Sequence, residues 1–225
     1  MISVIVVAGG SGKRMLSEIP KQFLELNGLP IIMHTLNKLN KSISTEKEFI
    51  LVLPENQTDY WEGLCIQHQF NIPHTIAFGG NERFDSVKNG LEKISPNSKI
   101  VAIHDAVRPL IAHSVIQSLL SSVEHYPAVI PVIPVFESIR KITGENSSEI
   151  VNRNEYVLVQ TPQVFQTEII KKAYKQPYSP EFTDDASVAE HAGYSIKTIE
   201  GNRENIKLTT PFDLQLAECL MQNQL

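Results

Sequence analysis

The stretch ISVIVVAGGSGKRM, residues 2–15, decides the fold, because an apolar run, interrupted only by Ser3, passes directly into a glycine-rich turn. The run from Ile2 to Ala8 has no basic region before it, so it is predicted to be a strand and not a signal peptide. Apolar runs without alternation are typical of strands buried on both faces of a parallel sheet. Similar runs, rich in Val and Ile, follow at residues 49–53, 75–78, 99–103 and 128–135.

Helical patterns separate these runs. Apolar residues recur three and four positions apart at Phe84, Val87, Leu91 and Ile94, and again at Ile116, Leu119, Leu120 and Val123. Strands that alternate with helices predict an α/β fold built on a doubly wound, mostly parallel sheet.

The C-terminal region predicts a last helix with a clear beginning. Thr210 is its expected N-cap, Pro211 takes the first helical position, and Asp213 completes a capping box. The apolar face of this helix is predicted to consist of Leu216, Ala217, Leu220 and Met221.

Residues 137–160 form a polar segment that interrupts the alternation. A turn cluster, Gly144 to Ser148, lies between two β-like stretches, which predicts a β-hairpin arm inserted into the α/β body. A lone two-stranded arm is marginally stable in water, so we expect it to pack on a second subunit. Because no repeat or linker is visible, we expect a single domain over residues 1–225, with a dimerisation arm at about 136–160.

Composition and charge exclude several classes of protein. The 225 residues are 42% hydrophobic with a net charge of -5, which excludes a disordered chain and argues against nucleic acid or an anionic membrane as a partner. No apolar run approaches the roughly 20 residues that cross a bilayer. The two cysteines, Cys65 and Cys219, form no C-x-x-C motif, so a reduced, cytoplasmic location is expected.

The glycine-rich turn, residues 8–15, matches neither common nucleotide motif. A Rossmann fingerprint needs a third glycine where Met15 stands, and a Walker loop needs Ser or Thr where Arg14 stands. A glycine loop still lets backbone N–H groups approach phosphates, and Arg14 with Lys21 adds two cations that suit a triphosphate. The alternative is a glycine turn with solvated charges.

Two further stretches follow predicted strands. In GGNERFDSV, residues 79–87, turn amides and Ser86 could contact a base, but a helix capped by Asn81 is the interpretation we favour for this stretch alone. In HDAVRP, residues 104–109, Asp105 could hold Mg²⁺ directly or through water, and Arg108 could hold a phosphate. An internal ion pair between these two side chains explains that pattern equally well.

Other polar residues point individually to structural roles. Thr183 precedes two acids and could cap a helix, Lys207 could be a surface lysine, and Arg153 could simply be solvated on the arm. The seven histidines and the cysteines lack metal-ligand spacing, and Ser11 lacks a G-x-S-x-G elbow. A thiolate or imidazole metal site and a serine hydrolase are therefore not expected.

Taken in order, these stretches resemble one family, the 2-C-methyl-D-erythritol 4-phosphate cytidylyltransferases of non-mevalonate isoprenoid biosynthesis. A relative with the same fold, ribitol-5-phosphate cytidylyltransferase, is the alternative. Val107 favours that relative slightly, whereas TDDAS, PVFESIRK (134–141) and Arg153 favour the methylerythritol enzyme more strongly. The matching stretches are AGGSGKRM (8–15), PKQF (20–23), GGNERFDSVKNGL (79–91), HDAVRP (104–109), QTPQVF (160–165), TDDASVAE (183–190) and GNRENIKLTTPFDL (201–214).

The resemblance implies a Rossmann-like nucleotidyltransferase fold, CTP and a polyol phosphate as substrates, Mg²⁺ as cofactor, and a homodimer formed through the arm. It implies that Arg14, Lys21 and Lys207 are catalytic. It places CTP against Ala8, Gly9, Gly10, Ser11, Gly12, Gly79, Gly80, Asn81, Ser86, Asp105 and Ala106, with the metal near Asp105. It places the polyol phosphate against Arg108, Thr183 and Lys207, with Ser138 and Arg153 reaching in from the neighbouring subunit.

The chemistry of this reaction fits the absence of an obvious catalytic base. A phosphate monoester has a second pKa of about 6, so the nucleophile is already ionised at pH 7. The protein must instead align two anions and offset their charge. A second hypothesis is a non-catalytic CTP-binding module, and a third, a dinucleotide oxidoreductase, fails at Met15.

Overall fold

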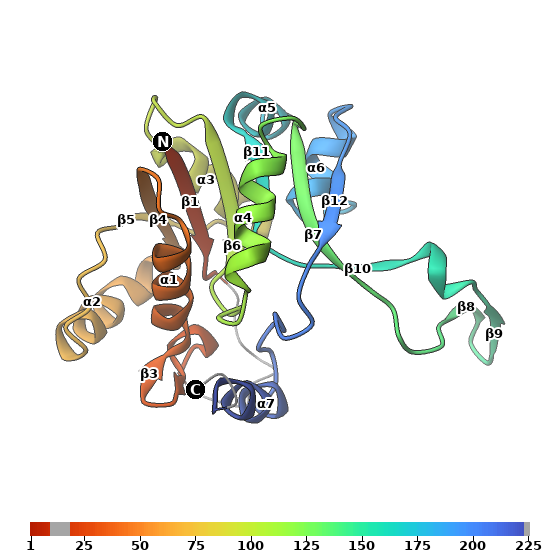
Figure 1. Ribbon diagram of the computed structural model, residues 1–225, viewed down its shortest axis with the longest axis horizontal. Coiled ribbons are helices and arrows are strands. Elements are labelled where there is room, and N and C mark those ends of the chain that lie inside the picture. The colour runs from red at the N-terminus through yellow and green to blue at the C-terminus, as the bar shows by residue number, and fades with distance from the viewer. Residues whose placement is uncertain (10–18, 223–225) are drawn as a thin grey trace.

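The computed structural model describes residues 1–9 and 19–222, and these form a central sheet of eight strands with helices on both faces (Figure 1). The strand order is β10-β7-β11-β6-β1-β4-β5, and β12 also pairs with β7. The strands are β1 (Ile2–Val7), β4 (Lys47–Leu53), β5 (Thr75–Phe78), β6 (Ile100–Asp105), β7 (Ala128–Pro134), β10 (Val157–Val159), β11 (Gln163–Gln166) and β12 (Lys197–Glu200).

Most neighbouring strands run parallel. β1 pairs in parallel with β4 and β6, β4 with β5, and β12 with β7, whereas β11 and β10 are antiparallel to their neighbours. This arrangement confirms the predicted doubly wound, mostly parallel sheet. Parallel neighbours require a crossover, which the intervening helices provide.

Helices cover both faces of the sheet, and this explains the unbroken apolar runs. On one face α1 (Ile31–Ser42), α2 (Thr58–Gln67) and α4 (His113–Ser122) pack with Val4 and Val6. On the other face α3 (Arg83–Lys93), α5 (Thr167–Ala173) and α6 (Asp185–His191) pack with Ile5. Because successive side chains of a strand point to opposite faces, β1 is apolar on both sides except at Ser3, whose buried hydroxyl bonds Glu48 and Ser98. Among the described residues, no helix has the length and apolar character to span a membrane.

A third, smaller layer lies beside the carboxyl ends of the strands. It contains the hairpin β2 (Glu25–Leu26) and β3 (Leu29–Pro30) and the helix α7 (Pro211–Gln222), which share a small apolar cluster. The predicted cap of α7 is confirmed, since Asp213 Oδ2 accepts hydrogen bonds from the N–H groups of Thr209 and Thr210, both at 2.8 Å. One predicted core position is wrong: Leu216 is exposed, and Leu214 packs in the cluster instead.

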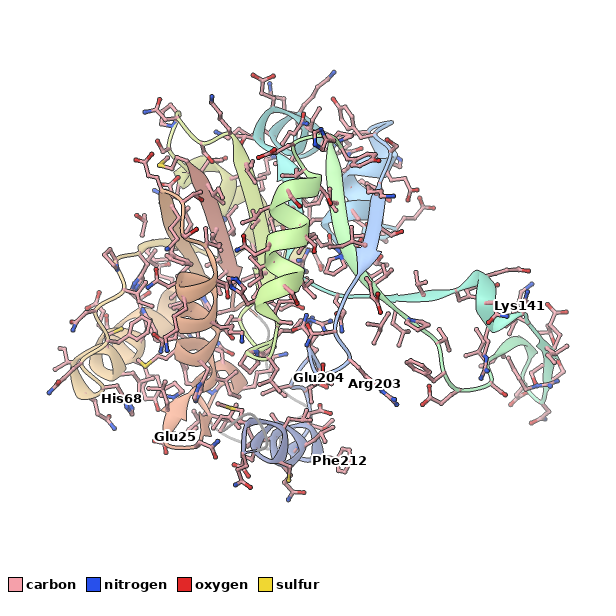
Figure 2. The ribbon with its side chains drawn as sticks, viewed as in Figure 1. Glu25, His68, Lys141, Arg203, Glu204 and Phe212 are labelled. Carbon is pink, nitrogen blue, oxygen red and sulfur yellow. The ribbon has the colours of Figure 1, made fainter. Side chains whose placement is uncertain are left out.

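Residues between β7 and β10 leave the body as an arm (Figure 1). Its tip is the antiparallel pair β8 (Arg140–Gly144) and β9 (Ser147–Ile150), and the short helix η4 (Arg153–Glu155) lies on the return. At its root the ring of Phe136 lies 4.6 Å from the guanidinium of Arg203. Figure 2 shows the side chains, Lys141 among them, reaching well away from the body. Two apolar side chains of the tip, Ile142 and Ile150, are 80% and 81% exposed.

Two short 3₁₀ helices complete the body near the site, η2 (Lys21–Phe23) and η3 (Glu55–Gln57). The side chain of Gln22 in η2 donates to the Ala8 carbonyl at 2.9 Å and to Gln57 Oε1 at 2.7 Å. These bonds attach the segment that carries Lys21 to the end of β1.

Gly90 allows α3 to lie directly on the sheet, and this yields a stability prediction. A Cβ at Gly90 would lie 2.9 Å from Ile5 Cγ2 and 3.1 Å from Val52 Cγ2. We expect Gly90→Ala to lower the free energy of unfolding by about 1–3 kcal/mol, as overpacking of a core does. Urea denaturation followed by circular dichroism measures the change.

The matched control is Gly63, which lies in α2 with nothing within 4 Å of an added Cβ. Gly63→Ala should leave stability unchanged or raise it by up to about 1 kcal/mol, because alanine favours helix. Equal effects of the two substitutions would contradict the packing explanation.

Candidate active site

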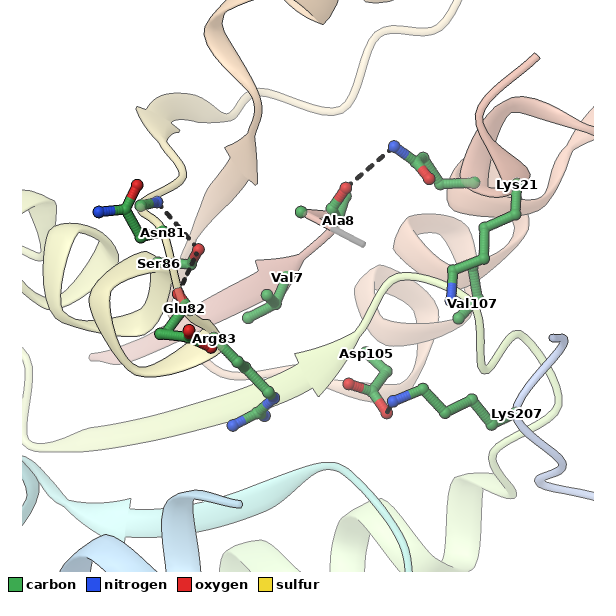
Figure 3. Close-up of a pocket in the computed structure, with 13 residues that line it drawn as sticks. Val7, Ala8, Lys21, Asn81, Glu82, Arg83, Ser86, Asp105, Val107 and Lys207 are labelled. Carbon is green, nitrogen blue, oxygen red and sulfur yellow. Dashed lines mark hydrogen bonds and ion pairs between the residues drawn. The ribbon is translucent and has the colours of Figure 1, made fainter. Parts of the chain in front are cut away.

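A pocket lies at the carboxyl ends of β1 and β6, where the end of β6 meets four other segments (Figure 3). Open α/β sheets bind ligands at this edge. The segments are the end of β1, the helix η2, the turn before α3, and the segment that leads to α7. The described lining residues are Val7, Ala8, Gly9, Lys21, Gln22, Gly80, Asn81, Glu82, Arg83, Ser86, Asp105, Val107 and Lys207.

A second pocket shares three residues with the first, namely Arg83, Asp105 and Lys207. The two pockets are therefore adjacent halves of one site. The other described residues that line the second pocket are Arg108, Val159, Gln160, Thr161, Gln163, Thr183 and Asp184. The structure thus brings Arg108, Thr183 and Lys207 together, although the first and the last of them are 99 positions apart in the sequence.

Asp105 is the charged centre shared by both pockets. Its Oδ2 lies 3.1 Å from Arg108 Nε and 3.0 Å from Lys207 Nζ. Burial alone would raise the pKa of this carboxyl, but Lys207, Arg83 and Arg108 hold the pKa well below its usual range. The ion pair expected as an alternative to a ligand site is therefore present, and it lies inside the pocket.

Arg83 also lines both pockets, and sequence reasoning did not single it out. Its guanidinium binds both carboxylate oxygens of Asp185, at 2.8 and 2.6 Å, and the Tyr174 hydroxyl donates to Asp185 Oδ1 at 2.6 Å. Burial by itself would lower the pKa of Arg83. The fully buried Asp185 outweighs this effect, so the pKa of Arg83 is raised above its ordinary value. The pair spans 102 positions, so no local pattern in the sequence could have indicated it.

Ser86 shapes the turn that borders the first pocket. Its hydroxyl accepts from the Gly80 N–H at 3.0 Å and donates to the Glu82 carbonyl at 3.1 Å. Gly80 lies so close to α3 that an added Cβ would be 2.2 Å from Asp85 Cβ. The prediction that Asn81 caps α3 is wrong: Glu82 is the N-cap, and its N–H bonds Asp85 Oδ2 at 3.1 Å.

His104 precedes Asp105 in β6 and is fully buried. Its Nε2 donates to the Arg108 carbonyl at 3.0 Å, and its Nδ1 accepts from the Thr161 hydroxyl at 3.0 Å. Burial lowers the pKa of this imidazole to about 4. The ring is therefore neutral at physiological pH.

Comparisons with known proteins agree with this geometry. The sequence profile described as "2-C-methyl-D-erythritol 4-phosphate cytidylyltransferase" matches residues 2–223. The chain belongs to this cytidylyltransferase family. A relative of that name from Bacteroides thetaiotaomicron is 50% identical over 219 residues, which are 97% of this chain and 99% of the relative. Another of that name, from Clostridioides difficile, is 37% identical and covers 98% of this chain and 94% of its own.

Solved structures of the family have the same fold. The 4-diphosphocytidyl-2C-methyl-D-erythritol synthase of Anaerococcus prevotii superposes with a TM-score of 0.83 at 25% identity, covering 98% of this chain and 96% of that one. The 2-C-methyl-D-erythritol 4-phosphate cytidylyltransferase of Thermus thermophilus gives 0.79 at 28% identity, with 98% of both chains covered. The predicted family and fold are confirmed.

The residues that resemblance to the cytidylyltransferases selected lie in three places. Most of those described line the two pockets, whereas Gly79 and Ala106 lie next to lining residues within the chain. Ser138 and Arg153 lie on the arm, where the Arg153 guanidinium bonds the Phe136 carbonyl. Outside the described residues lie Gly10, Ser11, Gly12 and Arg14.

The motif TDDAS, residues 183–187, does not begin α6 as the sequence suggested. Asp184, not Thr183, is the N-cap of α6, and its side chain accepts from the Ser187 N–H at 2.8 Å. Thr183 precedes the cap and lines the second pocket with Arg108 and Lys207.

Because the His104 imidazole is buried and neutral, we expect the free energy of unfolding to fall as the pH becomes acidic. The unfolded chain binds a proton on His104 near its ordinary pKa of 6.5, whereas the folded chain does so near 4. We expect the free energy of unfolding to fall by up to about 3 kcal/mol on this account as pH drops from 6.5 to 4, with no contribution above that window. The unfolded chain protonates Asp105 near its ordinary pKa of 3.8, so the contribution of Asp105 is lost mainly below this window.

Urea denaturation at pH 7.0, 5.5 and 4.5 measures this effect, with His104→Gln as the reference. The pKa of His34 is also lowered by burial, but His34 is present in both proteins and its contribution cancels. We expect a flatter pH dependence for His104→Gln. Parallel curves for the two proteins would contradict the low pKa of His104.

Proposed function

We propose that this protein transfers CMP from CTP to 2-C-methyl-D-erythritol 4-phosphate, giving 4-diphosphocytidyl-2-C-methyl-D-erythritol and pyrophosphate, in non-mevalonate isoprenoid precursor biosynthesis. The name of relatives that are 50% identical over nearly the whole chain supports this reaction. The structural observation that carries it is a pair of adjoining pockets that share Asp105, Arg83 and Lys207. Two anionic substrates repel each other, so they can react only where positive charge lies between their two binding sites.

The first pocket is the proposed CTP site. It is lined by Ala8 and Gly9 and by Gly80, Asn81 and Ser86, beside which the cytosine would lie. Gly79 and Ala106 support these walls, since the Gly79 N–H bonds the Leu53 carbonyl at 2.8 Å and the Ala106 N–H bonds the Val7 carbonyl at 3.0 Å. Backbone groups in such a turn can approach a nucleotide closely. Gly10, Ser11, Gly12 and Arg14 complete this site in the proposal.

The second pocket is the proposed site for the polyol phosphate. Arg108 and Lys207 supply positive charge and Thr183 a hydroxyl, a set that suits a phosphate monoester. Asp105 holds the two cations through ion pairs, so they are oriented before substrate arrives. The neighbouring position of the CTP site would place the monoester oxygen beside the α-phosphorus.

The residues act on charge and alignment in this mechanism. The monoester oxygen forms a bond to the α-phosphorus, and the bond from that phosphorus to the bridging oxygen breaks, so pyrophosphate leaves. Because the nucleophile is ionised at pH 7, no general base is needed. Lys21 and Arg14 would stabilise the charge on the reacting phosphates, and Lys207 would offset the entering monoester.

The donor set around Asp105 fits magnesium held chiefly by the substrate. Both ion pairs of Asp105 use Oδ2, so Oδ1 is the oxygen that could hold the ion directly or through water. Among the described residues no group of three acids, histidines or cysteines converges, and magnesium commonly uses one or two carboxylates with substrate phosphates. The bound ion would supply further charge neutralisation at the phosphates.

The proposed enzyme is a homodimer located in the cytoplasm. The exposed apolar side chains of Ile142 and Ile150 favour burial of the arm against a partner subunit. Ser138 and Arg153 on the arm would then reach the partner subunit's polyol phosphate pocket. The low number of cysteines, two in 225 residues with no C-x-x-C motif, favours a reducing compartment.

Release of pyrophosphate tests the reaction directly. The protein, CTP and Mg²⁺ are assayed with 2-C-methyl-D-erythritol 4-phosphate and, in parallel, with ribitol 5-phosphate, and UTP replaces CTP in a third series. We expect release with CTP and the methylerythritol substrate. Faster release with ribitol 5-phosphate would reassign the substrate, and CTP binding without release in any series would indicate a non-catalytic module.

A further inference from the structure

We propose that His104 is a positioning residue for the polyol phosphate, because its Nε2–H holds the main-chain carbonyl of Arg108. The inference rests on the proposed function, in which Arg108 binds the monoester. His104 is fully buried and is not among the described residues that line either pocket, so it acts through its neighbours and not on substrate.

The direction of each hydrogen bond follows from the chemistry of the partners. The Arg108 carbonyl can only accept, so His104 Nε2 has to carry the hydrogen at 3.0 Å. In a neutral ring Nδ1 then accepts, and its partner at 3.0 Å is the Thr161 hydroxyl. The Thr161 oxygen in turn accepts from the Asp105 N–H at 3.1 Å. A single tautomer of His104 satisfies the whole chain.

These bonds fix Arg108 at both of its ends. His104 holds its carbonyl, whereas Asp105 Oδ2 accepts from its Nε at 3.1 Å and the Asn205 carbonyl accepts from its guanidinium at 2.8 Å. Removing the first contact leaves the Arg108 carbonyl without this donor and releases the main chain at Arg108. The guanidinium would then lose its alignment with the pocket while the rest of the fold stays unchanged.

The position of His104 in the strand supports a dedicated role. It follows Val101, Ala102 and Ile103 in β6, and all of these are buried. A polar ring in this apolar strand costs free energy unless both nitrogens are bonded. Both nitrogens are bonded here. Nε2 bonds the carbonyl of Arg108, and Nδ1 bonds the Thr161 hydroxyl, which accepts from the Asp105 N–H.

Two near-isosteric variants separate the two nitrogens. In His104→Gln the amide nitrogen can replace Nε2 and donate to the Arg108 carbonyl. In His104→Asn the shorter side chain can accept from Thr161 but does not reach Arg108. We expect KM for methylerythritol phosphate to rise about tenfold in His104→Asn, the change expected for one lost buried hydrogen bond, and to stay near the wild-type value in His104→Gln.

The ratio of the two KM values distinguishes positioning from a merely structural role. Loss of folding would lower the active fraction of both variants and leave KM for both substrates unchanged, so KM for CTP is measured in parallel. We expect KM for CTP to stay unchanged. A rise of both KM values together, or equal KM for the polyol phosphate in the Gln and Asn variants, would overturn the proposal.

A measurement on the unaltered protein guards against variants that fail to fold. Long-range ¹H–¹⁵N correlation spectra at pH 7 are expected to show the Nε2–H tautomer for His104, and the Nδ1–H tautomer would overturn the proposal. Arg108→Ala identifies a failure of the proposed function: an unchanged KM for the polyol phosphate would overturn the substrate pocket itself. If Arg108→Ala raised KM for the polyol phosphate but His104→Gln and His104→Asn had equal KM values, only the role of His104 would be overturned.

Discussion

Lys21→Ala is expected to lower kcat roughly 10²–10³-fold while leaving the fold intact, the usual result of removing one donor that stabilises transition-state charge. Lys21 lies in η2 at the edge of the first pocket (Figure 3), and η2 is tied to the end of β1 through Gln22. Pyrophosphate release under saturating CTP and methylerythritol phosphate measures kcat. Lys21 is half-buried, so its loss should shift the free energy of unfolding only slightly.

Lys88→Ala is the matched control, since Lys88 is exposed on α3 and is not among the residues that line either pocket. It should show wild-type kcat and an unchanged melting temperature. If Lys21→Ala kept more than about a tenth of wild-type kcat, its assignment to the reacting phosphates would be wrong. A melting temperature that fell together with kcat would point to a folding defect instead.

A heterodimer that pairs a Lys21→Ala subunit with an Arg153→Ala subunit is expected to recover about half of wild-type turnover, although each variant alone is nearly inactive. In the proposed dimer each site combines the body of one subunit with the arm of the other. The Arg153→Ala body meets an intact arm from its partner, so one of the two sites is complete. Co-expression with two affinity tags isolates this heterodimer.

The opposite arrangement provides the control. When both substitutions lie on one subunit and the partner is wild type, one site lacks Lys21 and the other lacks Arg153, so we expect almost no turnover. Sites contained within one subunit would reverse the two results, with about half activity in the second heterodimer and none in the first. The pair of heterodimers therefore decides whether the arm crosses between subunits.

The helix caps show where local sequence was sufficient and where it was not. At α7 the Thr210, Pro211 and Asp213 pattern predicted the observed cap, because these residues interact within one turn. At α3 the same reasoning selected Asn81, whereas Glu82 is the N-cap. The Ser86 hydroxyl holds the preceding turn through Gly80 and Glu82, and this shifts the start of the helix by one residue.

Some residues of the candidate site could likewise be selected from local sequence, and others could not. Asp105 and Arg108 could be selected because charged residues directly follow a buried strand, and their ion pair is three residues apart. Arg83 and Asp185 could not, since each alone is an ordinary charged residue near a helix start. Their pairing depends on α3 and α6 covering the same face of the sheet.

The sequence by itself predicted the strands β1, β4, β5, β6 and β7, the helices α3, α4 and α7, and the two-sided cover of the sheet. It could do so because apolar periodicity and turn chemistry act over a few neighbouring residues. Only the tertiary structure decided that Arg83 is held by Asp185, that Lys207 meets Asp105, and that His104 supports the turn of Arg108. Such contacts depend on how distant strands and helices pack, and no short-range pattern encodes that packing.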